Sequence, residues 1–378
     1  MSSTFGRAAV MVEANAPFEI REYPLPPAAE GTILVRVLCC TICRSDYHTF
    51  SGKRSGPTPL ILGHEIVGEI VELGKGVVYD MNDLPLAVGD RITWTLTANC
   101  GRCYYCLAAE LPMKCIKLFK YGHDSCAEPP HFLGGFAEYC LIQPGTAVIK
   151  VPGHLSDEVA APANCALATV MACWDTASLK QGESVLIQGA GGLGCYAAAV
   201  ARSSGCTRVI VADVSAKRLE FARLFGATDT IEVPGPKQPA AADANTAISL
   251  VGRVRELTKG RGTDCALEVT GSPETVLEGL QCLRKGGRYI EAGCSFPEAR
   301  IELDLSVILW NRITFTGVHN YHARHLKAAV DFLEAERERY PFDKIVTKSY
   351  PLEEIDRAME TAASGAELRV AVRPAFTP

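Results

Sequence analysis

The sequence predicts a two-domain α/β protein, with an antiparallel barrel-like domain and a parallel sheet covered by helices. Three observations carry this prediction. The chain has 378 residues, which is long for a single hydrophobic core. Residues 1 to about 160 contain short β-type runs separated by Gly/Pro turns. From about residue 165 strand-like and helix-like segments alternate, which is typical of a parallel sheet with helices on both faces.

Each element follows from its own pattern. In the first domain we expect strands at TILVRVLC, EIVGEIVEL, DRITWTL and AEYCLIQ. In the second domain SVLIQ precedes the helix-like GAGGLGCYAAAVARSSG, TRVIVAD precedes SAKRLEFARLFGA, and CALEVTG precedes PETVLEGLQCLRKGG. RYIEAG is the last strand of this alternation, and the Pro/Ala-rich segment at 233–247 predicts an exposed loop.

The last part of the chain is expected to return to the first domain. From about residue 297 it shows a strand, a helix (HLKAAVDFLEAERER) and a strand again. The predicted division is therefore 1–165 with 297–378 for the barrel-like domain, and 166–296 for the parallel-sheet domain.

Composition argues against several classes of protein. Hydrophobic residues make up 48% and charged residues 21%, which is ordinary for a soluble globular protein. The net charge is −5 and no basic block occurs, so nucleic acid is not an expected partner. No signal-peptide pattern is visible, and glycines and Gln188 break the most apolar stretch, so no membrane span is expected. Sixteen cysteines without a secretion signal predict reduced thiols, some of them holding metal, in the cytoplasm.

A glycine-rich segment predicts a dinucleotide site. GAGGLG places Gly189, Gly191 and Gly194 in the G-x-G-x-x-G pattern, between a strand and a helix. The first glycine allows a tight turn, the second lets a pyrophosphate approach the backbone, and the third lets helix and strand pack closely. The phosphates would meet the N–H groups at the helix N-terminus. A glycine-rich turn in another kind of α/β protein is the alternative.

Asp213, which ends TRVIVAD, predicts the choice of cofactor. Its carboxylate can accept hydrogen bonds from the adenosine ribose of NAD. A 2′-phosphate at about 4 Å would cost roughly 4 kcal/mol at an effective dielectric of 20, or about a thousandfold against NADP. Lys217 and Arg218 lie nearby in the sequence and would soften this penalty.

Two groups of residues predict metal sites. The segment NCGRCYYCLAAELPMKC contains four cysteines, which suit a closed tetrahedral Zn–S₄ site of structural type: Cys100, Cys103, Cys106 and Cys115. The second group is spread along the chain and consists of Cys43, His64 and Cys165. Two cysteines and a histidine leave one position of a zinc tetrahedron open for substrate. Each of these three residues alone would more often be an ordinary core residue, so only the combination is informative.

These motifs together resemble the zinc-dependent medium-chain alcohol dehydrogenase family. GHEIVGEIVELGKGV, VGDRI, the four-cysteine segment and GAGGLG occur in that family's order, and the resemblance covers essentially the whole chain. It implies a GroES-like catalytic domain interrupted by a Rossmann domain. It also implies that Cys43, His64 and Cys165 bind the catalytic zinc.

The resemblance further implies roles for CTICRSDYHTF. Ser45 would hydrogen-bond the alcohol at the metal, and His48 would pass its proton toward solvent through the nicotinamide ribose. Glu65 would lie beside the metal, and Asp46 would orient His64. Arg44 and Arg369 match positions that touch the cofactor pyrophosphate. Motif and resemblance together predict this cofactor site: Arg44, Gly189, Gly191, Gly192, Leu193, Gly194, Asp213, Arg218, Thr270 and Arg369.

One branch of the family offers an alternative substrate. KLFKYGHD and TGVHNYHARHL are similar to sequences found with phosphonate-catabolism genes, which implies a hydroxyalkylphosphonate or a similar anionic alcohol. Lys117, Lys120 and His123 in the first run could attract an acidic group, although a solvated loop is the plainer interpretation. His319, His322 and His325 in the second run are interpreted as a helix start, with a metal site as one alternative and an anion-binding role for His319 or Arg324 as another.

The sequence therefore predicts a zinc- and NAD-dependent alcohol dehydrogenase with two zinc ions per chain. It would oxidise a primary or secondary alcohol reversibly and assemble as a dimer or tetramer. A zinc-free quinone or enone reductase of the same superfamily is one rival, but it gives no reason for the seven ligand-type residues. A non-catalytic protein that retains the fold is another, but such a protein should have lost part of the Ser45–His48 relay.

Overall fold

Two compact units make up the structure, a computed structural model that describes residues 4–235 and 249–375. Most of the loop predicted at 233–247 lies outside the described residues. The first unit is formed by three segments of chain and the second by two. The first comprises Met1–Ala168, Asn320–Glu338 and Phe342–Pro378, and the second comprises Thr169–His319 and Arg339–Pro341.

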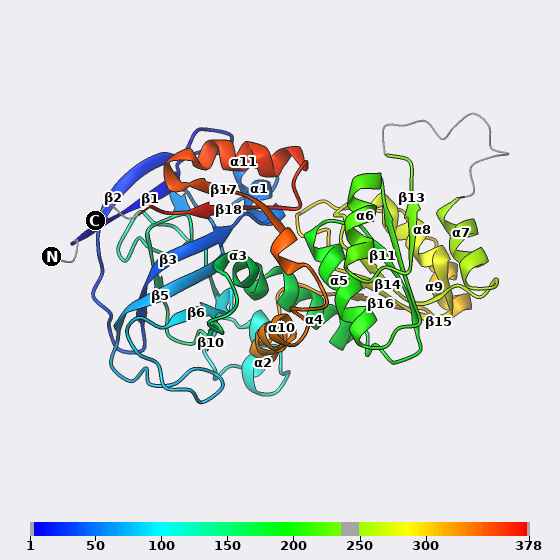
Figure 1. The fold of residues 1–378 in the computed structure, drawn as a ribbon, viewed down its shortest axis with the longest axis horizontal. Coiled ribbons are helices and arrows are strands. Elements are labelled where there is room, and N and C mark those ends of the chain that lie inside the picture. Colours follow the sequence, from blue (N-terminus) through cyan, green and yellow to red (C-terminus); the bar gives the residue numbers. More distant parts are fainter. Residues whose placement is uncertain (1–3, 236–248, 376–378) are drawn as a thin grey trace. The chain divides into compact units, whose positions relative to one another are not determined.

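The first unit is built around a seven-stranded, mostly antiparallel sheet. Its strand order is β10-β6-β5-β3-β18-β17, and β9 also pairs with β3. A three-stranded sheet (β2-β1-β4) and a two-stranded sheet (β7-β8) complete it. The C-terminal strand β18 pairs with β3, so red and blue strands are neighbours in Figure 1. The chain thus returns to its first domain, as the sequence predicts.

The strands of the first unit have these bounds: β1 Phe5–Met11, β2 Glu19–Pro24, β3 Ile33–Thr41, β4 Leu60–Ile61, β5 Glu65–Leu73, β6 Arg91–Trp94, β7 Thr97–Ala98, β8 Phe119–Lys120, β9 Tyr139–Ile142, β10 Val148–Lys150, β17 Val346–Pro351 and β18 Arg369–Arg373. Its helices have these bounds: α1 Arg44–Phe50, α2 Tyr104–Leu107, η1 Pro112–Lys114, α3 Asp157–Ala160, η2 Ala161–Asn164, α10 Ala323–Ala335, η3 Phe342–Lys344, η4 Leu352–Glu354 and α11 Ile355–Ser364. Helix α4, Ala166–Thr176, contains the division between the units.

The second unit is a parallel six-stranded sheet in the order β13-β12-β11-β14-β15-β16. Its strands have these bounds: β11 Ser184–Gln188, β12 Arg208–Asp213, β13 Asp229–Glu232, β14 Thr263–Glu268, β15 Leu283–Glu291 and β16 Thr314–Gly317. Its helices are α5 Gly192–Ser203, α6 Ala216–Leu224, α7 Leu250–Leu257, α8 Glu274–Cys282 and α9 Leu305–Asn311. Every residue of β11 is buried, as expected of a parallel strand covered on both faces. The predicted fold class, a barrel-type domain with a Rossmann-type domain, is confirmed.

Each unit has its own hydrophobic core. The core of the first contains the fully buried aromatic side chains Trp94, Tyr121, Phe132 and Phe136. The core of the second lies under β11 and β14 and includes Leu186 and Ala266. Burying one large apolar side chain stabilises a fold by about 1.5–3 kcal/mol, so each unit has its own driving force for folding.

The second unit extends further along the chain than the sequence predicts. The expected boundary at 297 would give the following strand to the first domain. Instead β16 pairs in parallel with β15, through Tyr289 opposite Phe315, and adds an edge strand to the six-stranded sheet. Residues up to His319 therefore belong to the second unit.

No helix within residues 4–235 and 249–375 is both long enough and apolar enough to cross a bilayer.

Asp264 in β14 gives the second unit a pH-dependent contribution to stability. Its carboxylate accepts hydrogen bonds from the backbone N–H of Ser184 at 2.8 Å and from Arg284 Nε at 2.6 Å. Burial raises the pKa of Asp264, but these donors and the charge of Arg261 outweigh burial and lower it to about 2. The unfolded carboxyl group has a pKa of 3.8. The stabilisation is therefore complete above that pH and is lost as the pH falls toward 2.

We predict that Asp264→Asn lowers the free energy of unfolding by about 2 kcal/mol at pH 7, with a smaller loss between about pH 4 and pH 2. Urea unfolding of both proteins across this pH range measures the difference. Glu256→Gln removes an exposed ion pair with Arg253 in the same unit and should cost less than about 0.5 kcal/mol. Equal costs for the two substitutions at every pH would contradict this assignment.

Candidate active site and cofactor-binding segments

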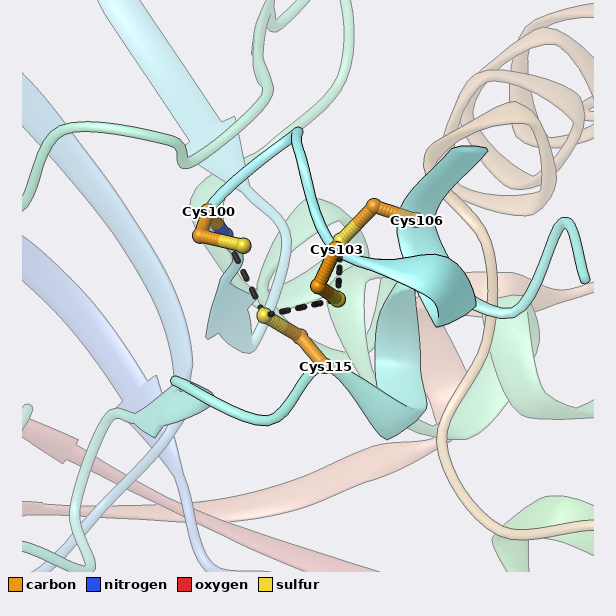
Figure 2. A group of neighbouring side chains, drawn as sticks. All are labelled: Cys100, Cys103, Cys106 and Cys115. Atoms are coloured by element: carbon orange, nitrogen blue, oxygen red, sulfur yellow. Dashed lines mark hydrogen bonds between the residues drawn. The ribbon is translucent and has the colours of Figure 1, made fainter. Parts of the chain in front are cut away.

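Four cysteine side chains converge in the lobe that carries α2 and η1 (Figure 2). The Sγ atoms of Cys103 and Cys106 are 3.5 Å apart, and those of Cys103 and Cys115 are 3.9 Å apart. A zinc ion bound at about 2.3 Å to four sulfurs would place them ~3.8 Å from one another. The arrangement of Cys100, Cys103, Cys106 and Cys115 therefore fits a tetrahedral zinc ion with no protein ligand missing.

Backbone N–H groups favour thiolates in this lobe. The N–H groups of Cys100 and Lys117 each donate to Cys115 Sγ at 3.3 Å. Hydrogen bonding, most strongly from the backbone of Ile116, lowers the pKa of Cys103 to about 6, whereas burial and the neighbouring thiols raise the pKa of Cys106 to about 12. Because zinc binds the thiolate form, this local backbone geometry prepares the lobe for the metal.

The second predicted metal site also comes together in the structure. Cys43 precedes α1, His64 precedes β5, and Cys165 follows η2. One ligand-type atom of each lies within 4.8 Å of the others, and Glu65 belongs to the same cluster. All of these residues lie in the first unit, and His64 is only 1% exposed.

The surroundings of this cluster favour positive charge. Burial lowers the pKa of His64, but the carboxylate of Asp46 and the thiol of Cys43 outweigh burial and raise it to about 10. The hydrogen bond with Cys165 and the charge of His64 hold the pKa of Cys43 well below its usual range, despite burial. A site with two thiols and a nearby carboxylate suits a divalent cation, and the donor set fits zinc.

Two carboxylates, Asp46 and Glu65, lie beside the ligand-type residues. Asp46 Oδ1 lies 3.0 Å from His64 Nδ1, and Asp46 Oδ2 accepts the backbone N–H of Cys43 at 2.9 Å. Nδ1 is thereby engaged, which leaves Nε2 of His64 for a metal. Glu65 accepts hydrogen bonds from Thr41 Oγ1 at 2.5 Å and from Arg369 Nη1 at 2.6 Å.

Arg369, which is predicted to touch the cofactor pyrophosphate, also contacts one of these carboxylates. It is only 6% exposed and forms an ion pair with Glu65. Burial raises the pKa of Glu65 to about 7, although the charge of Arg369 opposes this increase. The guanidinium thus helps to keep a carboxylate charged in a buried position.

The two predicted relay residues lie on the short helix that begins directly after one member of the cluster, Cys43. Ser45 and His48, 9% and 7% exposed, are both on α1, which starts directly after Cys43. Burial, followed by the charges of Lys53 and Arg44, lowers the pKa of His48 to about 4. His48 is therefore neutral near pH 7 and able to accept a proton.

Three basic side chains lie close to the metal-ligand cluster. The rings of His123 and His64 are 5.4 Å apart between centroids. Burial, then the charge of Arg54, lowers the pKa of Lys120 to about 8. Among the described residues, Arg54 Nη1 and His123 Nε2 are buried without a hydrogen-bond partner, and no carboxylate forms an ion pair with Arg54 or Lys120.

The glycine-rich segment has the conformation that its motif predicts. Gly189 has φ +107°, which disfavours any other residue. A Cβ on Gly194 would lie 1.8 Å from the carbonyl oxygen of Gly189, so glycine alone allows α5 to approach β11. A Cβ on Gly191 would meet nothing within 4 Å, and this open space at the N-terminus of α5 fits a pyrophosphate.

Asp213 lies at the end of β12 beside this segment. Its Oδ2 accepts the backbone N–H of Ala190 at 2.7 Å, and its Oδ1 accepts that of Ser215 at 2.9 Å. Each carboxylate oxygen keeps a lone pair for a ribose hydroxyl. Arg218 follows in the first turn of α6.

The remaining predicted cofactor residues occupy separate positions. Gly192 and Leu193 begin α5. Thr270 lies after β14, and its backbone N–H donates to Glu268 Oε1 at 2.5 Å. Arg44 is exposed at the start of α1, and its guanidinium lies 4.9 Å from the ring of Tyr47.

Sequence reasoning missed four residues of the metal-ligand region. They are Thr41, Arg54, Asn164 and Tyr321. Asn164 was detectable only as the residue that precedes Cys165, and Tyr321 only as part of HNYHARH. Neither position carries a sequence pattern of its own, because their contacts join segments that are distant along the chain.

Comparison with known proteins agrees with this arrangement. Residues 29–153 match the alcohol dehydrogenase GroES-like domain, and residues 192–335 match the zinc-binding dehydrogenase domain. The 5-exo-hydroxycamphor dehydrogenase of Pseudomonas putida is 31% identical over 97% of this chain and 98% of its own.

Solved structures show the same likeness. An alcohol dehydrogenase of Thermotoga maritima is 32% identical, with a TM-score of 0.90 over 99% of this chain and 100% of its own. A zinc-binding dehydrogenase of Sinorhizobium meliloti, solved with NADP, is 26% identical with a TM-score of 0.83 over 98% of this chain and 100% of its own.

The matched domains cover most of the chain, and the relatives are oxidoreductases. The expected family is confirmed, whereas the phosphonate-associated branch stays a prediction. The chain belongs to the zinc-dependent medium-chain alcohol dehydrogenase family.

Proposed function

We propose that this protein is a zinc- and NAD-dependent dehydrogenase that oxidises a primary or secondary alcohol reversibly to an aldehyde or ketone. The observation that carries the proposal is the buried cluster of Cys43, His64 and Cys165, with Ser45 and His48 on the adjoining helix. A zinc ion held by these ligands would acidify the alcohol hydroxyl, and NAD would accept the hydride.

The residues of the chain would then handle the proton. The Ser45 hydroxyl hydrogen-bonds the substrate hydroxyl and takes part in moving its proton. His48 is neutral before the reaction and receives that proton only transiently, because its low pKa favours rapid release of the proton toward solvent. Asp46 keeps the ring of His64 in one orientation, so the ligand geometry is maintained through the reaction.

We also propose two zinc ions per chain, the second held by the four-cysteine lobe. The separations between sulfurs and the low pKa of Cys103 support this second ion. A zinc-free quinone or enone reductase remains the rival within the superfamily, but it gives no function to either thiol-rich cluster. A non-catalytic protein with this fold would have no need for Ser45 and His48 beside the ligands.

NAD is the proposed cofactor because a carboxylate ends β12. Asp213 favours the ribose hydroxyls and opposes a 2′-phosphate. The Sinorhizobium meliloti structure with NADP shows that a protein of this fold accepts the phosphorylated cofactor, so the charge at Asp213 is the decisive feature in this chain. The proposed pyrophosphate site is the open space over Gly191.

We further propose that the protein associates with a second copy through its parallel sheet. β16 is an edge strand, and neighbouring α9 exposes Leu305, Leu309 and Trp310, each more than 70% exposed. An exposed apolar row beside a sheet edge is typical of a surface covered by a partner. The sixteen unpaired cysteines support the cytoplasm as its location.

An alcohol that carries an anionic group, such as a hydroxyalkylphosphonate, is the second candidate substrate. The observation that favours it is the pair of basic side chains Arg54 and Lys120 near the metal ligands. Arg54 Nη1 is buried and has no hydrogen-bond partner among the described residues, and such a buried donor is costly unless an acceptor binds there. Phosphonate, phosphate and carboxylate groups would each supply the acceptor that Arg54 Nη1 lacks.

The reaction is tested by NADH formation from a panel of alcohols with zinc-loaded protein. We predict that Ser45→Ala lowers turnover by about 100- to 10,000-fold, because proton transfer loses its first acceptor. The variant should keep two zinc ions and its affinity for NAD. Ser55→Ala, an exposed serine just beyond α1, is the control and should retain activity. Unchanged turnover in Ser45→Ala would refute the mechanism.

Cofactor choice is tested by Asp213→Asn. We predict that KM for NAD rises about tenfold and that discrimination against NADP falls at least tenfold, because the repelling charge is removed. Initial rates with each cofactor give both values. Asp229→Asn removes a carboxylate that pairs with Arg208 on the neighbouring strand, and it should change neither value.

The substrate class is tested by Lys120→Met. For an alcohol that ends in phosphonate or carboxylate, we predict a fall in kcat/KM of about 10- to 100-fold, as expected for a lost charge-assisted hydrogen bond. A neutral alcohol of equal length should change by less than about threefold. Lys117→Met removes an exposed lysine from the same segment and serves as the control. A general preference for neutral alcohols in the wild-type protein would dismiss the anionic substrate.

A further inference from the structure

Asn164 joins two of the metal-ligand segments. It is fully buried and directly precedes Cys165. Its Nδ2 donates to the carbonyl oxygen of His64 at 3.0 Å and to that of Trp94 at 2.9 Å. The carbonyl of His64 belongs to the peptide that leads into Glu65. One side chain therefore links the backbone of the histidine ligand to the segment that carries the second thiol ligand.

Tyr321 fixes the peptide that joins Asn164 to Cys165. Its hydroxyl donates to the carbonyl oxygen of Asn164, and that carbonyl is part of the peptide bond to Cys165. The hydroxyl also accepts the backbone N–H of Leu96 at 3.2 Å. Tyr321 is 3% exposed. It is the second residue of the segment that begins at Asn320, where the chain returns to the first unit.

The local backbone at Cys165 explains why such support is needed. Cys165 has φ −134° and ψ −70° and lies between η2 and α4, so it is not held by a regular helical hydrogen-bond pattern on both sides. Its N–H has only a long contact, 3.4 Å, to the carbonyl of Pro162. The direction of its side chain therefore depends on what holds the preceding peptide.

An asparagine at position 164 would be destabilising if its side chain only filled space in the core. Among the described residues its Oδ1 is buried without a hydrogen-bond partner. An apolar side chain would avoid this unsatisfied acceptor, but it would not bind the carbonyls of His64 and Trp94. The position thus retains an amide whose useful contacts are to the metal-ligand segments.

We propose that Asn164 and Tyr321 are positioning residues that set the spacing of His64 and Cys165 for the metal. The inference rests on the zinc site proposed above. The tyrosine acts on the peptide that precedes the thiol ligand, and the asparagine connects that peptide with the histidine ligand. Because metal ligands tolerate only small displacements, loss of either link should weaken metal binding before it unfolds the protein.

The test compares Tyr321→Phe with Tyr121→Phe in the full-length protein. Tyr121 is a matched control because it is also a buried tyrosine of the first unit. Its hydroxyl forms a hydrogen bond with Thr146 Oγ1 at 2.8 Å and accepts the backbone N–H of Gln143 at 2.7 Å. Both variants lose a buried hydroxyl that accepts a backbone N–H. Only Tyr321→Phe loses a contact to a metal-ligand segment.

We predict that Tyr321→Phe weakens zinc binding at this site by about 10- to 100-fold, measured by competition with a chromophoric chelator. The four-cysteine site should keep its affinity and act as an internal reference. In the Co²⁺-substituted protein, the visible absorption bands that report tetrahedral thiolate coordination should shift in Tyr321→Phe and not in Tyr121→Phe. Asn164→Ala should change binding and spectrum in the same direction.

Other outcomes separate the two levels of the proposal. If Tyr321→Phe and Asn164→Ala keep the wild-type spectrum and affinity, or change them only as Tyr121→Phe does, the positioning role is refuted while the zinc site stands. If the wild-type protein binds only one zinc ion, at the four-cysteine lobe, the proposed zinc site itself is refuted. Zinc content per chain distinguishes these two results.

Discussion

The buried hydrogen bond between Asp46 and His64 is the interaction on which the metal-ligand cluster depends. The same carboxylate accepts the backbone N–H of Cys43 and, at 3.3 Å, that of Gly63. It therefore fixes the start of α1, the turn before β5 and the histidine ring together. Removing a carboxylate from water is costly, and these donors offset that cost. Without the Asp46 carboxylate, Cys43 and His64 would lose the hydrogen bonds to one shared side chain that hold them in place.

The two cysteine clusters show two ways of arranging thiols for a metal. In the four-cysteine lobe all ligands come from residues 100–115, and nearby backbone N–H groups stabilise the thiolates. In the other cluster the ligands come from distant segments and are surrounded by buried carboxylates, an asparagine and a tyrosine. With zinc bound as proposed, the first arrangement would leave no ligand position open, whereas the second would leave one for chemistry.

Much of this could be predicted because the informative patterns are local. In the four-cysteine segment, in GAGGLG and at Asp213, the last residue of TRVIVAD, the residues that indicate a function lie within a short stretch of sequence. Tertiary contacts were harder to predict. Nothing in the sequence near Tyr321 shows that its hydroxyl will meet the carbonyl of Asn164, and Arg54 follows α1 in a segment that resembles an ordinary loop. Residues 297–319 group with the second unit, which the sequence alone does not indicate, because a short edge strand gains its identity only by pairing with β15.

The order of segments in the first unit has a consequence for the biosynthesis of the protein. The four-cysteine lobe is complete once residue 115 has left the ribosome, so a nascent chain can take up zinc there early. The other cluster needs Cys165 and, for the peptide that precedes it, Tyr321. Domains fold as units during synthesis, and most of the second unit is made between these two residues. At the proposed zinc site, full affinity for the metal would therefore be reached only after Tyr321 has been made, long after the four thiols of the lobe are in place.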